Sequence, residues 1–107
     1  MKIRNLVNLN GNAIKNQFII ENGNTISFQS YDSMICRIDH SGGLGFDKIV
    51  TLGKDWNFSK TTSRHLFAFL TQQGLGILAN RKAIEEAIER GHARLDGSIA
   101  VWLDETL

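Results

Sequence analysis

The chain has 107 residues, a length that suits one domain with a single core and is too short for two. Its composition, 42% hydrophobic and 21% charged, is that of an ordinary globular protein and excludes an intrinsically disordered one. The 12 basic and 11 acidic side chains leave a net charge of +1, so no overall field attracts a polyanion and any nucleic-acid contact must be local.

Cysteine usage and hydropathy bear on the compartment. The single cysteine, Cys36, cannot form an internal disulfide, which fits a reducing cytoplasm. No apolar run approaches the ~18 residues of a membrane span, and the first residues alternate polar and apolar positions, unlike a signal peptide. We therefore expect a cytoplasmic protein without membrane contact. Cys36 alternates with Met34 and Ile38, which predicts a small buried side chain rather than a nucleophile.

The first half of the sequence is expected to form an antiparallel meander of three to four strands. Short runs alternate apolar and polar residues with the period of β-strands. The runs expected to form this meander are residues 17–21, 25–30, 34–39 and 48–52, and a separate short strand is expected before them, near residues 3–9. Asn22-Gly23, the strongest short hairpin signal, joins two of them. Phe18 and Ile20 share one face of their strand, and Ile26 and Phe28 share one in the partner, which we expect to match in register.

Helical spacing begins after residue 58. Ser59 or Thr61 can cap a first helix by accepting hydrogen bonds from exposed backbone N–H groups, and this helix should stop near Gly74. Asn80 is expected to cap a second helix, which ends at Gly91. The positions that recur at helical spacing and should face the core are Ser63, Leu66, Phe67, Phe69, Leu70, Ile84, Ala87 and Ile88. We expect the apolar connector between the helices, residues 75–78, to be buried.

The last part of the chain again has the period of strands. Residues 92–103, around Asp96-Gly97, predict a final β-hairpin. Because strands and helices segregate along the chain instead of alternating, the predicted class is α+β. We expect a single domain over residues 1–107, with the antiparallel β-meander, two helices packed on one face and the C-terminal β-hairpin.

The densest cluster of aromatic, hydroxyl and basic side chains, residues 55–65, lies at the expected start of the first helix. A helix N-terminus offers unpaired N–H groups and a partial positive charge, which together suit an anion. Trp56 can stack on a base or anchor a protein partner. In the alternative interpretation, Trp56 and Phe58 pack into the core and the hydroxyls only cap the helix. The candidate partner- or anion-binding residues are Trp56, Ser59, Lys60, Thr61, Thr62 and Arg64, with Arg81 and Lys82 at the start of the second helix.

Other chemistry receives little support from the sequence. The glycine-rich loop 41–45 lacks the helix and the Gly-Lys-Ser/Thr ending of a P-loop, so we expect a hairpin tip. The histidines are isolated and Cys36 has no cysteine neighbour, which leaves no zinc spacing. Hairpins could gather a metal-dependent nuclease centre, although solvated hairpin ends are the simpler interpretation. Its residues would be Asp32, Asp39, His40 and Asp47. We therefore expect no enzyme, no catalytic residue, no cofactor and no metal.

Three segments carry a resemblance to a known family. They are Asn16-Gln17-Phe18-Ile19-Ile20, Phe28-Gln29-Ser30-Tyr31-Asp32-Ser33 and Trp56-Asn57-Phe58-Ser59-Lys60-Thr61-Thr62-Ser63. In this order they resemble a family of small uncharacterised proteins encoded by bacteriophages and other mobile elements of bacteria, over residues 16–91. The resemblance implies no catalytic residue. It implies that the protein is of phage origin, and small phage proteins often inhibit host machinery, CRISPR effectors included, by occluding a surface.

Two hypotheses follow for the function. The first is a phage-derived, non-enzymatic binding protein that inhibits a host defence protein by surface occlusion, as an anti-CRISPR does, in the cytoplasm of the bacterial host. The second is a small binder of a nucleotide or nucleic acid that uses the basic, hydroxyl-rich helix N-terminus at residues 59–64. Under the first, the partner is a CRISPR effector or similar protein, and nucleic acid is not required. Exposed apolar strand edges would also permit a homodimer.

Overall fold

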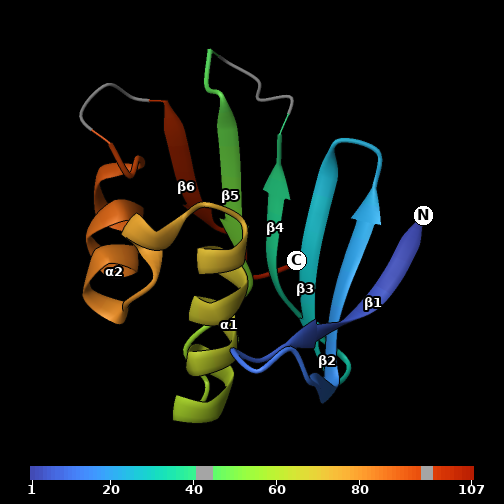
Figure 1. The fold of residues 1–107 in the computed structure, drawn as a ribbon. Helices are drawn as coiled ribbons and strands as arrows, with labels where there is room; N and C mark the ends of the chain where they lie inside the picture. Colours follow the sequence, from blue (N-terminus) through green and yellow to red (C-terminus); the bar gives the residue numbers. More distant parts are fainter. Residues whose placement is uncertain (41–44, 95–97) are drawn as a thin grey trace.

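The computed structural model describes residues 1–40, 45–94 and 98–107. These residues form a six-stranded sheet, two α-helices and a short 3-10 helix, η1 (Figure 1). The elements are β1 (Lys2–Val7), β2 (Ala13–Asn22), β3 (Thr25–Ser30), β4 (Ser33–Asp39), β5 (Lys48–Leu52), α1 (Lys60–Gln72), η1 (Gly76–Leu78), α2 (Arg81–Arg90) and β6 (Ile99–Leu103). The predicted α+β class is confirmed, but the sheet has more strands than the three to four predicted.

The sheet is mixed, with strands in sequence order from β1 to β6. Neighbours from β1 to β5 are antiparallel, as a meander requires, whereas β5 and β6 are parallel. Parallel neighbours need a long crossover, and α1, η1 and α2 provide it. The predicted C-terminal hairpin does not form as a pair of strands: β6 pairs with β5 instead, and among the described residues its antiparallel contact with residues 91–93 amounts to an isolated bridge between His92 and Ala100. The turn predicted at Asp96-Gly97 lies outside the described residues.

The β2–β3 hairpin forms where expected, but its register differs from the prediction. Asn22 pairs with Thr25, so the two turn residues are Gly23-Asn24 and not Asn22-Gly23. Gly23 has φ +63, which suits glycine at the first central position of a hairpin turn. Ile19 pairs with Phe28 and faces the core with it. Phe18 and Ile20 consequently lie on the opposite, half-buried face.

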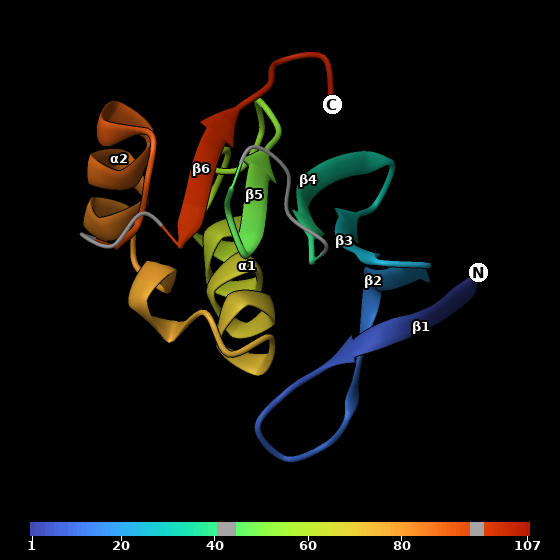
Figure 2. The same cartoon turned by 90° about the horizontal axis from the view of Figure 1, so that it is seen from above.

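Helix α1 is the main cover of the sheet, and α2 lies beside β6 (Figures 1 and 2). Four α1 side chains are buried, namely Ser63, Leu66, Phe69 and Leu70, as predicted, while Phe67 is only half-buried. The Phe69 ring stacks on Phe28 of β3 with centroids 5.6 Å apart. Ile84 and Ala87 of α2 join the same hydrophobic cluster. None of the described helices is long and apolar enough to cross a membrane.

The helix ends follow the local signals closely. The Ser59 hydroxyl accepts a hydrogen bond from the Thr62 backbone N–H at 3.1 Å, so Ser59 caps α1. The Asn80 side chain accepts from the Ala83 N–H at 2.8 Å and caps α2. Gly91, with φ +77, ends α2 in the left-handed conformation. The connector between the helices buries Leu75 and Leu78, although its Ile77 is exposed.

The two edges of the sheet differ. Backbone groups of Gly91 and Ala93 hydrogen-bond to β6 and cover part of its outer side. In the part of the chain that the structure describes, β1 pairs with β2 alone, and its Ile3 side chain is 60% exposed. An uncovered edge can pair with a second chain. Self-association thus stays a prediction, and β1 is the edge where we expect it.

Candidate functional site: two cavities at the N-terminus of helix α1

The predicted binding residues lie at an exposed corner of the molecule. Lys60, Thr61 and Arg64 are exposed, and Ser59 and Thr62 are half-buried because they form the cap. The first turn of α1 contains no acidic residue. The positive end of the helix dipole is therefore not compensated by its own side chains, which favours an anion from outside.

The two aromatic residues of the turn before α1 have opposite surroundings. Trp56 is 7% exposed and belongs to the core cluster, as the packing alternative predicted, so it cannot act as a surface anchor. Phe58 is 79% exposed, and its predicted packing into the core is wrong. Successive tight turns cause the difference: Trp56 N–H donates to the Gly53 carbonyl and Phe58 N–H to that of Asp55.

A basic hollow of about 560 Å³ opens beside Phe58. Its lining consists of Asn57, Phe58, Ser59, Lys60, Ser63, Arg64, Phe67 and Arg81. Arg81 ion-pairs with Glu85 at 2.8 Å, whereas Lys60 and Arg64 have no ion-pair partner in the part of the chain that the structure describes. Arg81 of α2 thus lines the same hollow as Lys60 and Arg64 of α1. Lys82, the neighbouring candidate, does not line the hollow.

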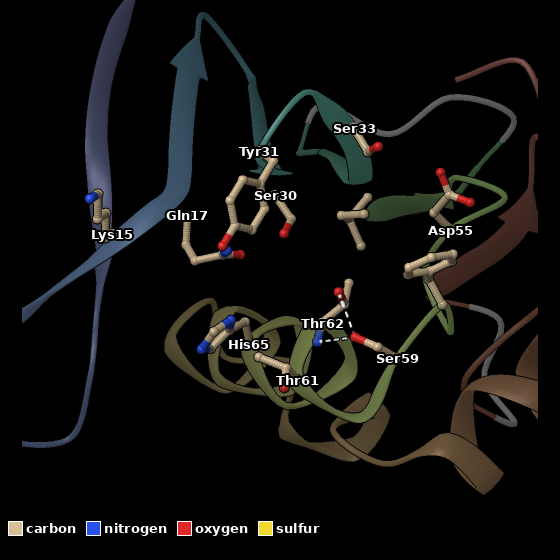
Figure 3. Close-up of a pocket in the computed structure, with 12 residues that line it drawn as sticks. Lys15, Gln17, Ser30, Tyr31, Ser33, Asp55, Ser59, Thr61, Thr62 and His65 are labelled. Atoms are coloured by element: carbon tan, nitrogen blue, oxygen red, sulfur yellow. Dashed lines mark hydrogen bonds between the residues drawn. The ribbon is translucent and has the colours of Figure 1, made fainter.

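A second cavity, the helix–sheet pocket, has a volume of about 470 Å³ and lies between α1 and the ends of β2, β3 and β4 (Figure 3). It is lined by Lys15, Gln17, Ser30, Tyr31, Ser33, Ile35, Asp55, Phe58, Ser59, Thr61, Thr62 and His65. Phe58 and Ser59 also line the basic hollow, so the two cavities adjoin at the helix N-terminus.

Two buried polar atoms in this pocket have no hydrogen-bond partner. They are Oε1 of Gln17, whose side chain belongs to a residue only 3% exposed, and Nδ1 of His65. Among the described residues, His92 Nδ1 is the one further atom in this condition. Buried polar groups are nearly always satisfied, and an exception calls for a specific explanation. Two of these three atoms thus belong to residues that line the helix–sheet pocket.

The backbone beside the pocket is unusual. Asn16 and Tyr31 are the described non-glycine residues with positive φ, at +63 and +53. Asn16 lies within β2 and Tyr31 lies in the connection between β3 and β4, and the Tyr31 N–H donates to the Asn16 carbonyl at 2.8 Å. The left-handed region is costly for an aromatic residue. This conformation holds the Tyr31 ring, 63% exposed, at the pocket (Figure 3).

Two titratable groups near the core are held neutral. Burial and, to a smaller extent, the charge of Arg64 lower the pKa of His65, so its imidazole is uncharged at neutral pH. Burial raises the pKa of the Cys36 thiol, and the residue is fully buried. The prediction that Cys36 is a small core side chain is confirmed.

Because the imidazole of His65 is neutral, one of its ring nitrogens donates a hydrogen bond and the other accepts one.

The nuclease arrangement considered from the sequence is not assembled. Asp32 precedes β4 and Asp39 ends it, so the strand separates these carboxylates along its whole length. Asp39 accepts hydrogen bonds from Thr25 and Arg37. Over residues 1–40, 45–94 and 98–107, no three His, Cys, Asp or Glu side chains gather closely enough to hold a metal ion. Residues 41–44 of the glycine-rich loop lie outside the described residues.

Sequence reasoning missed Gln17, Tyr31 and His65 as residues that line the helix–sheet pocket. The signal for Gln17 was its position two residues before Ile19, which places a polar side chain on the inward face of β2. The pairing of Ile19 with Phe28, which places this face of β2 toward the core, follows from a hairpin register that differs from the predicted one. Tyr31 gave no signal, since its left-handed backbone follows from the tight connection between β3 and β4.

Comparison with known proteins gives one match. The profile of a family of unknown function, DUF8033, covers residues 1–86. No curated protein and no solved structure matches the chain. The matched region includes β1 to β5, α1 and the cavities at its N-terminus, and it ends within α2. The chain therefore belongs to DUF8033, a family of unknown function.

Proposed function

We propose that the protein is a non-enzymatic binding protein that holds single-stranded nucleic acid on the basic hollow. The observation that supports this proposal is the grouping of Lys60, Arg64 and Arg81 around the exposed ring of Phe58. Proteins that bind single strands combine a positive groove for the phosphates with aromatic rings on which bases stack. An exposed ring needs an unpaired base, which favours a single strand over a duplex.

The charges of the molecule favour a local contact of this kind. A net charge of +1 gives no general attraction to nucleic acid. Lys60 and Arg64 lack ion-pair partners among the described residues and lie at the uncompensated positive end of α1. Binding should therefore be modest and should weaken steeply with salt, because it releases counterions from a small number of phosphates.

The test compares two variants of equal charge. K60Q/R64Q should lose most of its affinity for a labelled single-stranded oligonucleotide, and the slope of log affinity against log salt should flatten by about 1.4 if two phosphate contacts are lost. K2Q/R90Q removes the same charge from exposed residues that line neither cavity and should bind like the unmodified protein. Fluorescence anisotropy at several salt concentrations measures both. Equal losses in the two variants would contradict the proposal.

A second candidate is the inhibition of a bacterial host's defence protein by surface occlusion, in the manner of an anti-CRISPR of phage origin. Phe58 favours it, because a ring 79% exposed beside arginines has the composition of an interface hot spot. Purified CRISPR effectors should then bind the protein stoichiometrically without nucleic acid. F58A should weaken that complex by about 2 kcal/mol or more, and I77A, which changes another exposed apolar residue that lines neither cavity, should not. Absence of any complex at micromolar concentration would exclude this candidate for the effectors tested.

A further inference from the structure

We propose that the helix–sheet pocket is a nucleobase site, in which the amide of Gln17 recognises the hydrogen-bonding edge of one base of the bound strand. This inference rests on the proposed function. It adds that the protein recognises a base of the nucleic acid as well as its phosphates. Figure 3 shows the Gln17 side chain extending from β2 into the pocket between Tyr31 and His65.

The unsatisfied amide defines what the ligand must supply. Gln17 is 3% exposed, and its Oε1 is an acceptor without a hydrogen-bond donor among the described residues. A primary amide presents an acceptor beside a donor, and a half-turn of the group only exchanges them. Nucleobase edges carry the complementary pair, an N–H beside a ring nitrogen or carbonyl. Such bidentate pairing with Gln is a general means of reading a base.

The other walls suit a neutral, flat ligand. Ile35, Tyr31 and Phe58 provide apolar surface, and Ser30 and Ser33 provide hydroxyls. The lining contains one positive charge, Lys15, and one negative charge, Asp55. The lowered pKa of His65 keeps its imidazole neutral. A phosphate would find no concentration of positive charge here. A base has apolar faces and a polar edge, and a volume of about 470 Å³ lies within the usual range of small-ligand pockets.

The position of the pocket relative to the basic hollow connects base and phosphate. Phe58 and Ser59 line both cavities, so a strand whose phosphates contact Lys60 and Arg64 has a base within reach of the pocket. Sequence-specific recognition of single strands commonly splays out individual bases, stacks them on aromatic rings and bonds their edges. Tyr31, held at the pocket by its left-handed backbone, is the ring that we expect to stack on the inserted base.

The experiment measures base selectivity separately from phosphate binding. The unmodified protein and Gln17→Met are each titrated with three kinds of ligand. These are homopolymeric oligonucleotides that each contain a single type of base, an abasic oligonucleotide, and free nucleoside monophosphates. Methionine keeps the length of the side chain without its hydrogen-bonding groups. We expect the unmodified protein to distinguish the bases by about fivefold or more and to bind the abasic strand least tightly. Gln17→Met should lose this selectivity while keeping its salt dependence and melting temperature.

Tyr31→Asn supplies a second variant. Asparagine tolerates the left-handed backbone, so the turn should fold as before, while affinity for base-containing strands should fall about fivefold or more with the stacking ring removed. Unchanged base selectivity in Gln17→Met, or equal binding of abasic and intact strands, would overturn the nucleobase site and leave the proposed function standing. Absence of salt-dependent binding to every strand would overturn the proposed function. Tight binding of a monophosphate by the unmodified protein, lost in Gln17→Met, would support the pocket and identify a free nucleotide as the ligand.

Discussion

Phe69→Ala should lower the free energy of unfolding by about 3–5 kcal/mol. Phe69 has no exposed surface, and its ring stacks on Phe28 with a centroid separation of 5.6 Å. This contact joins the middle of α1 to β3, and the smaller side chain would leave a cavity in the one hydrophobic cluster that contains both elements. The total stability of a small domain is about 5–15 kcal/mol, so the variant should be marginally folded.

The matched control is Phe67→Ala, which removes the same side chain two positions earlier in α1. Phe67 is half-buried and lines the basic hollow, so water can fill the space that its ring leaves. The loss in the free energy of unfolding should therefore be smaller than for Phe69→Ala. Urea unfolding at 25 °C, followed by circular dichroism, gives the two free energies. Similar losses in both variants would show that α1 is not held to the sheet through Phe69.

Gly53→Ala should also destabilise the fold, by about 1–3 kcal/mol or more. Gly53 is buried directly after β5, and its N–H donates to the Ile35 carbonyl at 2.8 Å. A Cβ at this position would overlap the backbone carbonyl oxygen of Met34. Because the obstacle is backbone and not the end of a flexible side chain, β4 or the turn would have to move.

Gly76→Ala is the control for this substitution. A Cβ on Gly76 would meet no atom within 4 Å, and its backbone does not adopt a positive φ. The free energy of unfolding should change by less than about 0.5 kcal/mol. Thermal unfolding of both variants tests the difference, and a Gly53→Ala protein as stable as Gly76→Ala would refute the close approach.

The Gly53 turn also positions the candidate site. The hydrogen bonds from Trp56 and Phe58 back to Gly53 and Asp55 wind the chain so that Trp56 enters the core and Phe58 faces solvent. Any shift of Gly53 should therefore alter the orientation of Phe58. For this reason, a loss of nucleic-acid binding in Gly53→Ala would reflect the changed position of the Phe58 ring and not the loss of a direct contact between Gly53 and the nucleic acid.

The local sequence determined the helices and most strands of this protein. Ser59, Asn80 and Gly91 have side chains or backbone preferences that act within a few residues, and each has the predicted capping role. The periodic spacing of Leu66, Phe69 and Leu70 was sufficient to predict the buried face of α1. These predictions depend on neighbours in the chain, which is why the sequence alone could support them.

The tertiary structure decided how those elements combine. The parallel pairing of β5 with β6 depends on a crossover through both helices, and no signal near Ile99 to Leu103 distinguishes it from a hairpin. The burial of Trp56 beside the exposure of Phe58, and the approach of Arg81 to Lys60 and Arg64, likewise depend on contacts between distant segments. Gln17 faces the start of α1 only because β2 lies in the sheet that α1 covers. Local propensity fixes the conformation of a segment, whereas the burial of side chains from many segments together fixes which of them meet.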